Sequence, residues 1–513
     1  MVATGILASR VLGLVRQRVF GHFLGTSDGA DVFNAAFKIP NILQNLFGEG
    51  VLSASFIPVY ARLLAEGRKD DARRLAGAIA GLLGLATGLV VLVGVLATPV
   101  LIDLIAPGFS GLKRDETIRL VRILFPGAGF LALSAWCLGI LNSHRRFLLS
   151  YAAPVGWNVV MILALLWYGP GRDQFPLVEI VAWASVIGSA LQFGLQLPVV
   201  LRLARPAAPH LDRRSEPVRN VLSNFIPVFI GRGVFQISGY IDTVLASLLP
   251  GGAVAGLAYA QTIAMLPVSL FGMSVAAAEL PAMAGVAGAG TDAAAGLVTR
   301  LNAGLKQIAF FVVPSAAVFL ALGDVLAGAV YQSGAFTAGV TIYVWGILAG
   351  SAVGLLASTL SRLYSSVYYA LRDTRTPLRY AIIRVILTIG LGLVLAFVLP
   401  PLLGIEKRWG AAGLTTSAGI AAWIEFLLLR RSLNRRLGPS GVPPEFLLRL
   451  WAAAALGAGA GWGVKLLRPA HDPIAAALVI LGAFGVVYLA ATLLFRVPQA
   501  SALVARLRRQ GNA

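Results

Sequence analysis

Apolar runs of about twenty residues recur from end to end of the chain and are separated by short polar breaks. A helix needs about 20 apolar residues to cross the hydrocarbon core of a bilayer, so each run is long enough to span it. The pattern predicts an all-α polytopic membrane protein with fourteen transmembrane helices. The predicted helices cover residues 3–24, 31–65 with an interruption at Gly48-Glu49-Gly50, 72–106, 116–141, 150–168, 177–203, 220–249, 253–285, 294–322, 338–368, 377–399, 409–430, 446–466 and 473–495.

Composition supports the membrane assignment. The 513 residues are 58% hydrophobic and 12% charged, whereas soluble domains carry roughly 25% charged residues. A net charge of +20 would suggest nucleic acid as the partner of a soluble protein. Here Lys and Arg concentrate in alternate connections, as expected for loops on the cytoplasmic side. We therefore expect no nucleic-acid partner, and we expect both termini to be cytoplasmic.

An internal repeat indicates two related halves. Leu46-Phe47-Gly48 recurs as Leu270-Phe271-Gly272, and each copy is followed by a valine and a proline. Six is an even number of helices, so the two six-helix lobes would share one orientation in a parallel repeat, with the substrate path between them. The expected segments are an N-terminal lobe 1–205, a cytoplasmic basic connector 206–219, a C-terminal lobe 220–430, a cytoplasmic basic connector 431–445, two additional transmembrane helices 446–495 and a cytoplasmic basic tail 496–513.

Motifs for nucleotide hydrolysis and metal binding are missing from the sequence. It contains no Gly-Lys-Ser/Thr loop and no His-Glu-x-x-His motif, and its one cysteine and four histidines are far apart. We expect no enzyme activity, because no nucleophile, base or metal-ligand constellation lies at membrane depth. We also expect no cofactor or metal. Transport would then be coupled to a monovalent cation or to the membrane potential.

Charged side chains inside membrane helices are costly and usually face a cavity or a partner. The first predicted helix contains Arg10, Arg16 and Arg18. Arg16 lies nearest the helix midpoint, so a functional role is favoured over snorkelling to the interface. For Arg10 and Arg18 both interpretations stay open. The excess of such cations indicates an anionic substrate group, and phosphate or pyrophosphate oxygens match the guanidinium fork.

The second predicted helix has one polar wedge about 80° wide on a helical wheel. Its members are Asp31, Asn34, Lys38, Asn41 and Asn45. The amides add hydrogen-bonding capacity that an ion pair does not need, so the wedge predicts a wall of a water-filled cavity. In the alternative interpretation, Asp31 and Lys38 belong to structural ion pairs.

The second half of the chain has fewer charges at membrane depth. They are Arg232, Asp242, Glu279, Arg362 and Arg384. Asp242 with Thr243, or with Asp373, is a candidate site for a small cation. Structural pairing is the favoured alternative, because a hard cation needs several converging oxygens.

Several segments together resemble the MurJ/MviN family of lipid II flippases, which belongs to the multidrug/oligosaccharidyl-lipid/polysaccharide (MOP) exporter superfamily. The resemblance covers essentially the whole chain in order. The segments that carry it are Ser9-Arg10-Val11-Leu12-Gly13 with Arg16, Asp31-Val32-Phe33, Phe37-Lys38-Ile39-Pro40-Asn41, Phe47-Gly48-Glu49-Gly50, Phe56-Ile57-Pro58, Gly334-Ala335-Phe336-Thr337 and Tyr369-Ala370-Leu371-Arg372-Asp373-Thr374-Arg375-Thr376-Pro377.

The resemblance implies movement of undecaprenyl-pyrophosphate-linked disaccharide-pentapeptide from the inner to the outer leaflet of the bacterial cytoplasmic membrane, by alternating access, for peptidoglycan synthesis. Membrane lipids and peptidoglycan synthesis proteins are the other partners that it implies. It also implies a cation site in the second lobe near Asp242. The central-cavity positions that carry over are Arg10, Arg16, Lys38, Asp31, Glu49 and Arg362.

The sequence also departs from the family pattern. The positions concerned are Gln17, Gln44, Asn45, Gln261 and Thr262, where the family usually has charged residues. Arg232 is a candidate replacement for the arginine missing at Thr262. Three alternatives therefore stay open: a flippase for another polyprenyl-linked glycan, another exporter of the MOP type, and a non-transporting membrane scaffold that keeps the fold.

Overall fold

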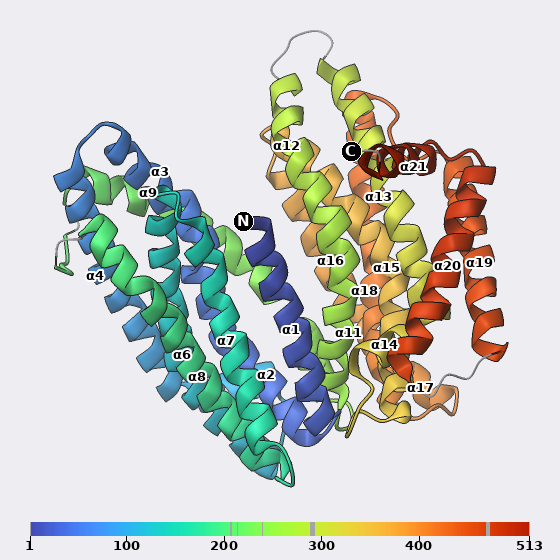
Figure 1. The fold of residues 1–513 in the computed structure, drawn as a ribbon, viewed down its shortest axis with the longest axis horizontal. Helices are drawn as coiled ribbons and strands as arrows, with labels where there is room; N and C mark the ends of the chain where they lie inside the picture. Colours follow the sequence, from blue (N-terminus) through green and yellow to red (C-terminus); the bar gives the residue numbers. More distant parts are fainter. Residues whose placement is uncertain are drawn as a thin grey trace. The chain divides into compact units, whose positions relative to one another are not determined.

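The computed structural model describes residues 2–205, 208–212, 214–238, 240–287, 293–467 and 472–511. These residues form helices joined by short connections (Figure 1). Their one β pairing is an isolated bridge between Ser333 and Phe336. The predicted all-α fold class is confirmed. In a bilayer a helix satisfies its own backbone hydrogen bonds, which explains why apolar runs of this length adopt it.

Twelve helical segments of the described residues are long and apolar enough to cross a membrane. Two further helices, α1 (Val2–Leu24) and α9 (Glu216–Ser238), have 23 residues each but are not among these twelve. The arginines of α1 lower its mean hydropathy. The total of fourteen spans includes these two helices and stays a prediction.

The chain divides into two compact units, and the first comprises Met1–Ala255 with Ser333–Phe336. Within this unit α6 packs against α2, α4 and α8, and α7 packs against α1 and α8. Its apolar core includes the buried side chains of Phe56, Tyr60 and Trp136. Besides α1 and α9, its helices are α2 (Asp28–Phe47), α3 (Glu49–Ala65), α4 (Lys69–Leu96), α5 (Thr98–Ile105), α6 (Gly111–Ser143), α7 (Phe147–Tyr168), α8 (Gln174–Ala204) and α10 (Ile241–Ser247).

The interruption predicted in the second helix is confirmed at Gly48. The backbone of Gly48 is extended, with φ −82° and ψ −165°, and it separates α2 from α3. A Cβ atom at this position would lie 2.0 Å from the carbonyl oxygen of Gln44, so the local geometry requires glycine. The single helix predicted over 72–106 is wrong in one respect, because α4 ends at Leu96 and α5 begins at Thr98, with Pro99 in its first turn.

The second unit comprises Gly256–Gln332 and Thr337–Ala513. Its main packing contact is between α15 and α18, and α13 and α16 lie against this pair. The predicted lobe boundaries follow the sequence repeat and stay a prediction. The helices are α11 (Ala253–Pro267), whose first turn belongs to the first unit, α12 (Ser274–Ala287), α13 (Ala293–Ala321), α14 (Gly323–Tyr331), α15 (Ala338–Ala370), α16 (Arg375–Leu393), α17 (Leu399–Leu402), α18 (Gly410–Leu437), α19 (Pro444–Leu467), α20 (Pro473–Leu494) and α21 (Pro498–Gly511).

Close packing of α15 on α18 depends on two glycines. A Cβ atom at Gly354 would lie 2.3 Å from the Cα atom of Gly419, so the two backbones approach too closely for any side chain. We expect Gly354→Ala to lower the free energy of unfolding by about 1–3 kcal/mol through overpacking. The matched control is Gly390→Ala, because nothing lies within 4 Å of a Cβ atom at that position. Equal melting temperatures of the two variants in detergent would contradict this explanation.

The two additional helices, α19 and α20, pack on α13 and α14 of the same unit. Lys465 Nζ lies 2.5 Å from Asp324 Oδ2, and Trp462 donates a hydrogen bond to the carbonyl of Ala321 at 2.9 Å. Tyr488 donates another to the carbonyl of Phe310. Polar contacts therefore fix this helix pair in addition to apolar packing.

Candidate substrate-binding site in the first unit

Asp31 lies in the first turn of α2 and is 1% exposed. Its carboxylate accepts hydrogen bonds from the backbone amides of Gly252 at 2.7 Å and Ala255 at 2.8 Å, so it caps the first turn of α11. Lys113 Nζ, from the start of α6, lies 2.7 Å from the same carboxylate and 2.6 Å from Asp28. The structure thus places Asp31 in a buried ionic network made by protein groups.

Lys38 lies near the middle of α2 and contacts α10 of the same unit. Its ammonium group donates a hydrogen bond to the hydroxyl of Thr243, and the carboxylate of Asp242 attracts it electrostatically. Tyr240 also donates a hydrogen bond to the Lys38 carbonyl at 2.9 Å. The structure therefore brings Lys38, a predicted substrate-binding residue, together with Thr243 and Asp242 of the predicted cation site, and its ammonium group is bonded to the Thr243 hydroxyl.

Arg16 is held against α7 by an aromatic contact. Its guanidinium carbon lies 4.5 Å from the ring centroid of Trp157, and its Nη1 lies 3.6 Å from the sulfur of Met161. The indole of Trp157 is fixed in turn by a 3.1 Å hydrogen bond to the carbonyl of Ser185 on α8. The ring centroid of Phe37 on α2 lies 5.9 Å from that of Trp157. Four helices therefore determine where this cation lies.

The other members of the polar wedge on α2 have different environments. Asn34 donates a hydrogen bond to the carbonyl of Ala30 within its own helix, at 2.8 Å. Asn41 and Gln44 line a cavity of about 20 Å³ together with Ser185 and Ser189 of α8. A cavity of this volume holds about one water molecule and offers it several polar partners.

The remaining predicted residues of the first unit are Arg10 and Arg18 of α1, Glu49 and Arg232. The side chain of Arg10 is exposed and that of Arg18 is half-buried. The side chains of Glu49 and Arg232 lie outside the described part of the chain.

In the second unit, Arg362 on α15 is exposed and belongs to a small charged group. The charges of Arg384 on α16 and Glu425 on α18 both act on its guanidinium. Arg384 and Glu425 form an ion pair of 3.2 Å, and Glu425 is 7% exposed. Two cations and one buried carboxylate leave this group with a net positive charge.

Asp373, the third residue of the predicted cation site, lies in the connection before α16. Its carboxylate accepts hydrogen bonds from the Thr376 hydroxyl at 2.7 Å and the Thr376 amide at 3.0 Å, and it pairs with Arg436 at 2.6 Å. These interactions lower the pKa of Asp373 to about 2, with the hydrogen bonds from Thr376 as the largest cause. Asp373 thus caps α16 and anchors α18 to it.

The lowered pKa of Asp373 predicts a stability contribution that depends on pH. The contribution is fully present above the unfolded pKa of 3.8 and is lost as the pH falls toward 2. We expect Asp373→Asn to lower the melting temperature in detergent at pH 6 and to have a smaller effect at pH 3. A difference that grows on acidification would contradict this assignment.

The sequence-based predictions did not include three charged residues, which are Lys113, Lys306 and Glu425. Lys306 is half-buried near the middle of α13, and Glu425 is buried within α18. Both are charges inside apolar segments, so the criterion that identified Arg16 would have found them. Lys113 gave no such signal, because it precedes the predicted helix 116–141 and its pairing with Asp31 is a long-range contact.

Known proteins with similar sequences share one description. The family model described as "Lipid II flippase MurJ" matches residues 20–491. A "Probable lipid II flippase MurJ" of Rhizobium tropici is 32% identical over 439 residues, which cover 85% of this chain and 80% of that protein. The "Lipid II flippase MurJ" of Burkholderia cenocepacia is 30% identical over 462 residues, which cover 88% of this chain and 87% of that protein.

Solved structures show the same fold. A structure titled "Lipid II flippase MurJ, inward closed conformation" superposes with a TM-score of 0.77 at 23% identity, over 96% of this chain and 98% of that one. An inward-facing multidrug transporter of the MATE family, in the MOP superfamily, gives a TM-score of 0.66 at 18% identity, over 83% of this chain and 95% of that one. Sequence and fold therefore agree: this chain is a multi-pass membrane protein that belongs to the lipid II flippase MurJ family.

Proposed function

We propose that this chain moves lipid II, undecaprenyl-pyrophosphate-linked disaccharide-pentapeptide, from the inner to the outer leaflet of the bacterial cytoplasmic membrane by alternating access. Membership of the MurJ family supports this function. The structural observation that carries the proposal is that two consecutive helices of the first unit each hold a cation in a defined place, Arg16 on α1 and Lys38 on α2.

A pyrophosphate group needs cations that are fixed before it arrives, because ordering a long side chain on binding reduces affinity. Stacking on Trp157 restricts the guanidinium of Arg16 to one plane, and its N–H groups lie in that plane. Lys38 supplies a second positive charge. In this proposal, Arg16 binds the pyrophosphate through hydrogen bonds and Lys38 binds it as a point charge.

The orientation and the energy source are part of the same proposal. Both termini lie in the cytoplasm, in agreement with the bias of Lys and Arg among the connections. Transport is driven by a monovalent cation gradient or by the membrane potential, and the carboxylate that acts electrostatically on Lys38 is that of Asp242. Peptidoglycan synthesis proteins consume the exported substrate and are the expected protein partners.

The proposal is tested in a bacterium depleted of its own lipid II flippase. We expect the wild-type chain to restore exposure of lipid II on the outer surface, and we expect Arg16→Glu to insert stably but fail. Restoration by both chains would show that transport does not need Arg16 and would contradict its role at the pyrophosphate. A stably inserted wild-type chain that leaves lipid II inside would assign a different substrate.

A further inference from the structure

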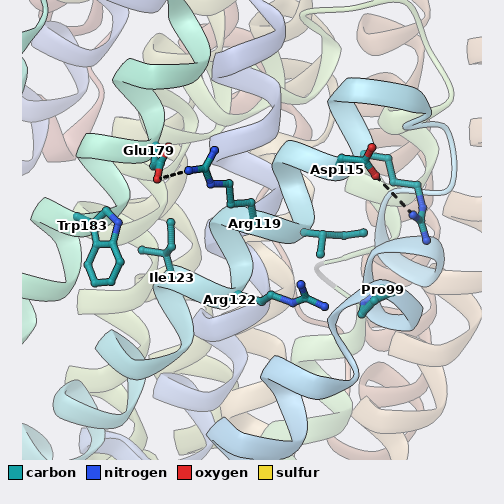
Figure 2. Close-up of a pocket in the computed structure, with 9 residues that line it drawn as sticks. Pro99, Asp115, Arg119, Arg122, Ile123, Glu179 and Trp183 are labelled. Carbon is teal, nitrogen blue, oxygen red and sulfur yellow. Dashed lines mark ion pairs between the residues drawn. The ribbon is translucent and has the colours of Figure 1, made fainter.

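A groove of about 710 Å³ runs along α6 in the first unit, on a face that the proposed transport function does not use. Residues of α5, α6 and α8 line it, including Arg119, Arg122, Glu179 and Trp183 (Figure 2). Figure 2 shows Arg119 directed toward Glu179 on α8, while Arg122 points the other way, toward Pro99. Two arginines one helical turn apart therefore line this groove, and their guanidinium groups point in opposite directions.

The groove lies on the opposite side of α6 from the cavity next to α2. At about 100° per residue, the six α6 residues that line the groove fall within about 180° of one another. The α6 residues that line the small cavity near Asn41 are centred about 180° away from them. The arginine groove is thus separate from the candidate substrate-binding site.

Arg122 differs from Arg114 and Arg119 in its ion pairing. Arg114 pairs with Asp103 at 2.7 Å, and Arg119 pairs with Glu179 at 2.8 Å. Within the part of the chain that the structure describes, no carboxylate lies within 4.0 Å of the Arg122 guanidinium. Arg122 is therefore the arginine of this groove that no ion pair holds among the described residues, while the carboxylates of Asp115 and Glu179, which also line the groove, lie against Arg114 and Arg119.

The surroundings of the groove are apolar and exposed. Val100 and Leu104 on α5 are each 70% exposed, and Trp183 on α8 is 51% exposed. The helices α6 and α8 are long and apolar enough to span a membrane, so the exposed Trp183 beside the groove faces lipid. Arg122 lies about 16 Å along α6 from its first residue, where a guanidinium can reach the headgroup region. Tryptophan is enriched at that same depth.

We propose that this groove binds the phosphate of an anionic phospholipid from the surrounding bilayer. Arg122 binds the phosphate oxygens, and Trp183 and Ile123 contact the glycerol and the upper acyl chain. Because Arg119 already neutralises Glu179, that carboxylate does not repel the phosphate. A bilayer lipid fits better than free phosphate, because the exposed apolar residues at the groove would contact its chains.

The test uses the purified full-length chain and native mass spectrometry, with phosphatidylglycerol and phosphatidylcholine as probes. We expect the wild type to retain phosphatidylglycerol preferentially, and we expect Arg122→Gln to reduce this preference roughly five-fold. Glu179→Gln releases Arg119, so it should raise the preference by a similar factor. The matched control is Arg172→Gln, because Arg172 is exposed in the connection between α7 and α8, outside the groove.

Three results would overturn the proposal. Equal retention of both lipids by the wild type would show that the groove has no selectivity for negative charge. Equal losses in Arg122→Gln and Arg172→Gln would indicate a general effect of net charge. Displacement of phosphatidylglycerol by millimolar inorganic phosphate would assign the groove to the free ion. Melting temperatures confirm that the variants are folded.

Discussion

Asp31→Ala is expected to lower the free energy of unfolding by about 3–5 kcal/mol, the range measured when one partner of a buried ion pair is removed. The substitution leaves the ammonium of Lys113, whose side chain is 18% exposed, with only the exposed carboxylate of Asp28. It also removes the acceptor for two backbone amides at the start of α11. Thermal unfolding in detergent and denaturant titration would measure the loss.

Asp28→Asn is the matched control, because the Asp28 side chain is 50% exposed and binds the same lysine. Exposed ion pairs contribute at most about 1 kcal/mol, so this variant should unfold almost as the wild type does. Asp31→Asn should fall between the two, since its amide oxygen can still accept a hydrogen bond. Equal effects of Asp31→Ala and Asp28→Asn would contradict the role assigned to burial.

Arg16→Ala is expected to reduce the rate of lipid II exposure about ten- to a hundred-fold while the protein stays folded. A hydrogen bond to a charged group contributes about 1.5–3 kcal/mol, and each 1.36 kcal/mol corresponds to a factor of ten. The comparison is made in the flippase-depleted bacterium, with membrane levels of the two chains matched.

Arg16→Lys separates charge from geometry. Lysine keeps the positive charge but lacks the planar fork that stacks on Trp157 and binds phosphate at two points. We expect intermediate transport, with most of the loss in apparent affinity. Full transport activity of Arg16→Ala would show that Arg16 is not part of the substrate site. If Arg16→Ala melted at a lower temperature than Arg16→Lys, Arg16 would have a structural role.

Sequence patterns predicted the fold class and most helix boundaries, because in a membrane each helix satisfies its own backbone hydrogen bonds and hydropathy alone identifies the span. They also predicted the break at Gly48 and singled out Arg16, whose guanidinium the structure places on the ring of Trp157. The segment predicted as a basic tail contains a further helix, α21, whose length is too short to give a membrane signal.

Only the tertiary structure decided which groups the polar side chains of each helix contact. The wedge on α2 looked uniform in sequence, yet Asp31 binds Lys113 and two amides of a segment more than 200 positions away, while Lys38 contacts Thr243. The arginine groove on α6 likewise depends on where α5 and α8 lie. Helix periodicity specifies which residues share a face of one helix, but the partner of each face depends on packing between helices far apart in the chain.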